Sequence, residues 1–143
     1  MTFLVDFLVG AALGAGFIAL ARSLGRLERA VLAGGLVLAA LAYVGFGVGP
    51  RAGSGLSVEL AGSLLFAAFG VLGLVSSLWF LCLGWAVHAV WDLAVPSLAD
   101  VSYMPLWYAA ACIGFDVVVA AYLLGRARGL LLVPGATDPA RAA

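Results

Sequence analysis

LAGSLLFAAFGVLGLVSSLWFLCLGWAVHAVW, residues 60–91, contains no Asp, Glu, Lys or Arg. As a single helix, the apolar region around it would be nearly twice as long as a bilayer core of about 30 Å is thick. Gly73, Ser76 and Ser77 interrupt this region, and such residues can cap and end a helix. We therefore predict two membrane-spanning helices joined by a tight turn between Gly73 and Ser77.

The composition of the whole chain is that of an integral membrane protein. Of its 143 residues, 66% are hydrophobic and 10% are charged, whereas a soluble domain has about a quarter charged residues. The mean hydropathy is +1.21. We expect a multi-pass protein of the plasma membrane with membrane lipid around it. Because the net charge is zero and no basic face is evident, we expect no nucleic acid partner.

Five apolar runs of 18 or 19 residues are each long enough to cross a bilayer. They cover residues 3–21, 30–48, 57–75, 78–95 and 106–124. The predicted fold is therefore all-α, a polytopic five-helix transmembrane bundle within a single domain, residues 1–132. Residues 133–143 contain prolines, a glycine and several alanines, and we predict a flexible C-terminal tail.

The arginines predict the orientation of this bundle, because arginine is concentrated in cytoplasmic loops. With five crossings and the N-terminus outside, Arg51 alone is placed outside and the C-terminus is cytoplasmic. The arginines then placed in the cytoplasm are Arg22, Arg26, Arg29, Arg126, Arg128 and Arg141. Four crossings would place the last three outside, so five agree better with the rule.

Three ionisable residues fall deep inside the fourth and fifth runs: His88, Asp92 and Asp116. At the rise of a helix, His88 lies about 10 Å and Asp116 about 15 Å below the outer surface. Consecutive helices joined by a short loop are normally antiparallel neighbours. We therefore expect His88 and Asp116 to meet near the middle of the bilayer.

The spacing of polar residues supports this expectation. Trp85, His88 and Asp92 share one helical face. Tyr108, Cys112 and Asp116 share a face of the next helix. The two stripes can therefore form a ladder of polar contacts between the two helices.

A charged carboxylate at the centre of a bilayer costs about 2.5–3.5 kcal/mol on insertion scales. Two carboxylates and one imidazole cannot all be charged at low cost there, so we expect them to share a proton. Such a cluster is suited to proton transfer or ligand binding. The structural alternative is that these residues only hold the two helices together by hydrogen bonds.

Asp6 and Glu59 lie within about a turn of the predicted outer surface, where we expect a solvated or capping role. They are included among the candidate ligand-binding residues because a cavity opening outward could also include them. Trp85 and Trp91 flank the polar stripe, and either line a ligand pocket or pack in the core.

Small residues on the first run, Gly10, Ala11, Gly14 and Ala15, form a surface of the GxxxG type. Such surfaces allow close helix packing, so a homo-oligomer is an open alternative to a monomer.

Several kinds of site are not expected. The glycines lack the strand and helix context of a nucleotide-binding loop. With one histidine and two cysteines at different depths, a closed zinc site is not expected. We predict no metal and no cofactor, although His88, Asp92 and Asp116 could supply three ligands to a harder ion.

Two sequence elements carry a resemblance. They are His88-Ala89-Val90-Trp91-Asp92 and the later segment with Pro105, Trp107, Tyr108, Cys112 and Asp116. Together they resemble the C-terminal signature, His-x-x-Trp-Asp followed by Pro-x-Trp-Tyr-x-x-x-Cys-x-x-x-Asp, of small bacterial and archaeal integral membrane proteins of unknown function. The resemblance implies that the elements form one unit, and it implies no activity. Leu93, Ala94 and Val95 stand where similar proteins often have further histidines.

Three functions remain open at this point. The cluster could bind or transfer a proton or a small polar or lipid-like ligand within the bilayer. It could instead catalyse an acid–base reaction on a lipid or isoprenoid-like substrate. Finally, the protein could be a structural or accessory subunit. The first is favoured slightly, because five short helices leave little room for a full catalytic site.

Overall fold

The computed structural model describes residues 2–48, 55–98 and 104–131, which fold into five α-helices. The helices are α1 (Phe3–Ser23), α2 (Glu28–Gly47), α3 (Gly55–Val75), α4 (Leu78–Leu98) and α5 (Leu106–Ala127), with a short 3-10 helix, Gly25–Leu27, before α2. No strand occurs in these described ranges. The prediction of an all-α five-helix bundle is confirmed.

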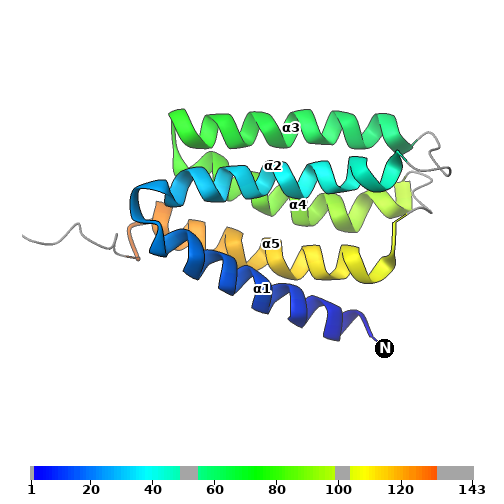
Figure 1. Ribbon diagram of the computed structural model, residues 1–143, viewed down its shortest axis with the longest axis horizontal. Coiled ribbons are helices and arrows are strands. Elements are labelled where there is room, and N and C mark those ends of the chain that lie inside the picture. The colour runs from blue at the N-terminus through cyan, green and yellow to red at the C-terminus, as the bar shows by residue number, and fades with distance from the viewer. Residues whose placement is uncertain (1, 49–54, 99–103, 132–143) are drawn as a thin grey trace, which may run out of the picture.

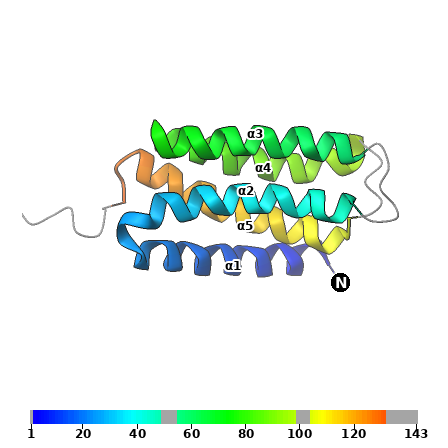
Figure 2. The same cartoon turned by 45° about the horizontal axis from the view of Figure 1, so that its top comes forward.

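The five helices lie side by side with their long axes close to parallel (Figures 1 and 2). Contacts follow the chain order around the bundle: α1 with α2, α2 with α3, α3 with α4, α4 with α5, and α5 back to α1. The contacts of α5 with α1 and α4 are the most extensive. The start of α1, the end of α4 and the start of α5 lie at one end of the bundle, called here the N-terminal end (Figure 1).

The opposite end of the bundle carries the arginines of the described residues. Arg22 lies in the last turn of α1, Arg26 in the 3-10 helix and Arg29 in the first turn of α2. Arg126 lies in the last turn of α5, and Arg128 follows its last residue. We call it the arginine end. Arg51, Arg141 and the tail 133–143 lie outside the described residues, and which end faces the cytoplasm stays a prediction.

The surface of the bundle is that of a membrane protein. Helices α1, α2, α3 and α5 are each long and apolar enough to cross a bilayer, and α4 is apolar from Leu78 to Ala94. Large aliphatic side chains point outward, among them Leu64, 75% exposed, and Leu106, 81% exposed. Lipid tails can solvate such surfaces without cost, whereas water cannot.

The predicted boundaries agree with the observed helices to within three residues at each end. The turn lies at Ser76 and Ser77, the C-terminal part of the segment in which it was expected, because α3 continues to Val75 and α4 starts at Leu78. The hydroxyl of Ser77 accepts a hydrogen bond of 3.3 Å from the backbone N–H of Trp79. A serine oxygen thus binds an otherwise unpaired donor at the start of α4, as expected for a cap.

Backbone-to-backbone contact joins α1 to α5. A Cβ atom on Gly10 would overlap the carbonyl of Ala111, and one on Gly114 would overlap the carbonyl of Phe7. Gly14 lies against Phe115 in the same way. The small-residue face of α1 is therefore occupied by α5 of the same chain, and a homo-oligomer stays an untested prediction.

We predict that Gly10→Ala destabilises the bundle by about 1–3 kcal/mol, because the added methyl group forces two backbones apart. Gly16→Ala on the same helix is the matched control, since nothing lies within 4 Å of its added Cβ. The measurement is the free energy of unfolding in mixed detergent micelles. Equal stability of the two variants would contradict the observed packing of α1 on α5.

Candidate functional site

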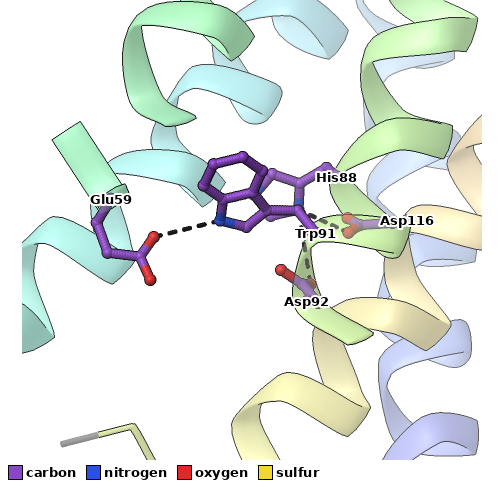
Figure 3. Close-up of polar contacts among 5 residues, drawn as sticks. All are labelled: Glu59, His88, Trp91, Asp92 and Asp116. Carbon is purple, nitrogen blue, oxygen red and sulfur yellow. Dashed lines mark hydrogen bonds and ion pairs between the residues drawn. The ribbon is translucent and has the colours of Figure 1, made fainter. Parts of the chain in front are cut away.

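His88 on α4 and Asp116 on α5 form a hydrogen-bonded pair inside the bundle (Figure 3). The distance from His88 Nδ1 to Asp116 Oδ2 is 2.7 Å, and both side chains are about 1% exposed. Asp92 lies one turn beyond His88 on the same face of α4, with its Oδ2 3.6 Å from the same Nδ1. One imidazole nitrogen therefore faces two carboxyl groups from two helices.

Aromatic rings surround this cluster. The ring of Phe66 on α3 meets the His88 ring edge-on, with centroids 4.6 Å apart, and the ring of Tyr43 on α2 does so at 5.8 Å. Both rings are 1% exposed. Residues of α2, α3, α4 and α5 thus enclose the imidazole, and the electrostatic interactions within the cluster are stronger than they would be in water.

Several polar atoms of the cluster have no hydrogen-bond partner among the described residues. They are His88 Nε2, both carboxyl oxygens of Asp92 and the hydroxyl of Tyr43. Buried polar atoms are almost always paired with protein, water or a ligand. Each buried group left unpaired costs about 1–3 kcal/mol. The Tyr43 hydroxyl is in electrostatic contact with Asp92, so either a small movement of these side chains or a bound donor would pair these atoms.

Two cavities reach the cluster from different sides. The first, of about 430 Å³, lies between α1, α4 and α5 at the N-terminal end and is lined by Asp92 and Asp6 together with Phe3, Leu93, Trp107 and other apolar residues. The second, of about 290 Å³, lies between α1, α2 and α5, and its lining includes Asp116, Tyr108 and Cys112. Asp92 therefore borders one cavity and Asp116 the other.

Comparison with known proteins identifies the family of this chain. Residues 5–129 match a family of unknown function (DUF6010). The chain belongs to this family. The match extends from the first turn of α1 to beyond the end of α5 and therefore includes all three residues of the cluster. No curated protein sequence and no solved structure matches the chain.

Glu59 lies about a turn from the start of α3, as the sequence predicted, but its side chain faces inward. The expected solvated role is wrong, because Glu59 is 2% exposed. Its Oε2 accepts a hydrogen bond of 3.4 Å from the indole N–H of Trp91 (Figure 3). Glu59, Ser63 and Phe66 are all buried and share the face of α3 that packs inward. Because α3 is almost uniformly apolar, its sequence does not show which face packs inward. That inward face carries Glu59 toward α4.

The other candidate residues divide between cavity and core. Asp6 is half-buried in the lining of the first cavity. Trp85 is fully buried, donates its indole N–H to the carbonyl of Leu32 at 3.2 Å and packs against two phenylalanine rings. Its polar atom is therefore used by the fold, although the ring also borders the second cavity. Trp91 lies edge-on to Phe66.

Tyr43 and Phe66 are members of the site that the sequence did not single out. Tyr43 contributes a hydroxyl in electrostatic contact with Asp92 and Cys112. Comparing depths in the fourth and fifth runs alone misses it, because it belongs to the second run. The signal is present in the sequence, since Tyr43 lies about a turn from the end of its apolar run and so falls at the level of Asp92 and Tyr108.

The donor set of the cluster could hold a small cation. One ligand atom each from His88, Asp92 and Asp116 lies within 4.8 Å of the other two. Carboxylate and imidazole groups suit several divalent ions. The predictions of no metal and no cofactor are not tested by this geometry, and they stay predictions.

We predict that His88→Ala and Asp116→Ala are strongly non-additive in their effects on the free energy of unfolding. Two groups in direct hydrogen-bond contact show a coupling of about 0.5–3 kcal/mol in a double-mutant cycle. The control cycle pairs His88→Ala with Glu28→Ala, which lies at the other end of the bundle and should be additive. An additive His88 and Asp116 cycle would contradict the observed pair.

Proposed function

We propose that this membrane protein binds and transfers a proton within the bilayer, at the cluster of His88, Asp92 and Asp116, in connection with a small polar or lipid-like ligand. The observation that carries the proposal is that the two carboxyl groups border different cavities and face the same imidazole nitrogen. A proton arriving at Asp92 from the first cavity can then reach Asp116, at the second, through a single histidine.

The hydrogen bond between His88 and Asp116 supports the presence of a proton in the cluster. A separation of 2.7 Å between Nδ1 and Oδ2 is a hydrogen-bond distance, which requires a proton between the two atoms. Repulsion between two charged carboxylates in an apolar environment disfavours losing both carboxyl protons. The cluster therefore keeps at least one proton. With the imidazole protonated at Nε2, Nδ1 can accept the proton of Asp92, which leaves an imidazolium and a carboxylate, and can then release the proton to an ionised Asp116.

The first cavity supports a ligand that carries hydrogen-bond donors. Both oxygens of Asp92 lack a partner among the described residues, and Asp6 adds a second carboxyl group to the lining. The remaining lining is aliphatic or aromatic. This combination suits a molecule with a polar donor group and an apolar part, which would displace water and change the proton affinity of Asp92 on binding.

We further propose that the His-x-x-Trp-Asp and Pro-x-Trp-Tyr-x-x-x-Cys-x-x-x-Asp elements are the functional signature of the DUF6010 family. Support comes from their position, since His88, Asp92 and Asp116 meet at one point and Trp107, Tyr108 and Cys112 line the cavities beside it. The plasma membrane, with the N-terminal end outside, remains the expected location.

Proton transfer is tested with protein reconstituted into liposomes that contain a pH-sensitive dye. After a pH jump, we expect Asp116→Asn to reduce protein-dependent proton flux about tenfold or more, because the amide cannot accept and release the proton. The control is Cys82→Ser, which alters another buried side chain of α4 away from the cluster and can keep the contact with the carbonyl of Ala120. Equal flux in Asp116→Asn and wild type would reject the proposal.

An intramembrane acid–base enzyme is the second candidate. A base held in place by a carboxylate is a common catalytic arrangement. Here Asp116 fixes the Nδ1 atom of His88, and Asp92 lines the first cavity. In this case His88→Ala should lower turnover of a lipid or isoprenoid-like substrate about a hundredfold or more. Turnover that survives this substitution removes the candidate.

A further inference from the structure

A separate cavity lies at the arginine end of the bundle, away from the cluster. Its volume is about 210 Å³, and three arginines line it, Arg26, Arg29 and Arg126. The remaining lining residues are Gly25, Glu28, Leu32 and Leu78. With one carboxylate among three guanidinium groups, the lining has an excess of positive charge. The proposed proton-transfer function does not use this site.

Arg126 is held in position before any ligand arrives. Its Nη1 donates to Glu28 Oε1 at 2.5 Å and to the Tyr122 hydroxyl at 2.7 Å. The Tyr122 hydroxyl in turn donates to the same Glu28 oxygen at 2.5 Å. Both partners of the ion pair have side chains only 10% exposed. A guanidinium group fixed in this way loses little conformational entropy when it binds an anion.

One side-chain nitrogen of Arg29 makes a hydrogen bond, and another makes none among the described residues. Its Nε donates to the backbone carbonyl of Gly73, at the end of α3. Its Nη2 is buried and has no hydrogen-bond partner among the described residues. A buried guanidinium donor without an acceptor is unfavourable. The side chain is therefore positioned for an acceptor that the protein itself does not supply.

We propose that this cavity binds a phosphate group, contacted by Arg29, Arg126 and Arg26. Guanidinium groups bind phosphate oxygens through paired, charge-assisted hydrogen bonds, which matches donors converging from α2 and α5. The place of the cavity at the ends of the membrane-spanning helices is the level at which phospholipid headgroups lie. The source of the phosphate that this position favours is an anionic phospholipid.

The test uses purified full-length protein in detergent micelles, titrated separately with phosphatidylglycerol, phosphatidylcholine and inorganic phosphate. Native mass spectrometry counts bound lipid, and tryptophan fluorescence follows the thermal midpoint. We expect one phosphatidylglycerol to bind more tightly than phosphatidylcholine or inorganic phosphate. Arg29→Gln should weaken phosphatidylglycerol binding about fivefold, the effect of losing one arginine contact at a membrane surface.

The matched control is Arg128→Gln, which removes the same charge from the same end of the bundle at an exposed position outside the cavity. We expect it to change the affinity by less than about twofold. Arg26→Gln, at an exposed position in the 3-10 helix, provides a second cavity variant if Arg29→Gln does not fold.

The outcomes separate the sources of phosphate. Arg29-dependent binding of phosphatidylglycerol supports the lipid site. Arg29-dependent stabilisation by inorganic phosphate alone supports the phosphate site and overturns its assignment to lipid. Equal losses of phosphatidylglycerol affinity in Arg29→Gln and Arg128→Gln indicate only general attraction to negative charge and overturn the proposal. Unchanged phosphatidylglycerol affinity in both Arg29→Gln and Arg26→Gln also overturns it.

Discussion

The absence of water from the interior of a bilayer is the constraint on which this structure depends. A polar side chain at the depth of His88 has to find its partner within the protein, and Asp116 of the neighbouring helix provides one at 2.7 Å. This bond fixes the level of α4 relative to α5. Because α5 also packs backbone-to-backbone on α1, this hydrogen bond and the glycine contacts both act on α5 and together help to set the register of three helices.

The middle of the bundle and its arginine end use charge in opposite ways. Midway along α4 and α5, two carboxyl groups face a histidine in an apolar enclosure, where protons are the charges most easily exchanged. At the arginine end, guanidinium groups cannot release their protons and are balanced by one glutamate, Glu28. The first arrangement suits the proposed transfer of a proton, and the second suits the proposed binding of a phosphate group.

The sequence predicted the level of each residue well and the direction it faces poorly. Depth follows from counting residues at a known rise, and this count places His88 at about 10 Å and Asp116 at about 15 Å, within about one helical turn of each other. Direction depends on how each helix is rotated, and α3 is apolar around its whole circumference apart from a few residues. Nothing in such a helix marks the inward face, so the burial of Glu59 beside Trp91 could not be derived.

Trp107 borders both cavities at the N-terminal end. An indole ring has few rotamers, and in each of them it fills a large part of the cavity that it enters. Because Trp107 is 59% exposed, the ring forms a wall that the two cavities share at the surface of the bundle.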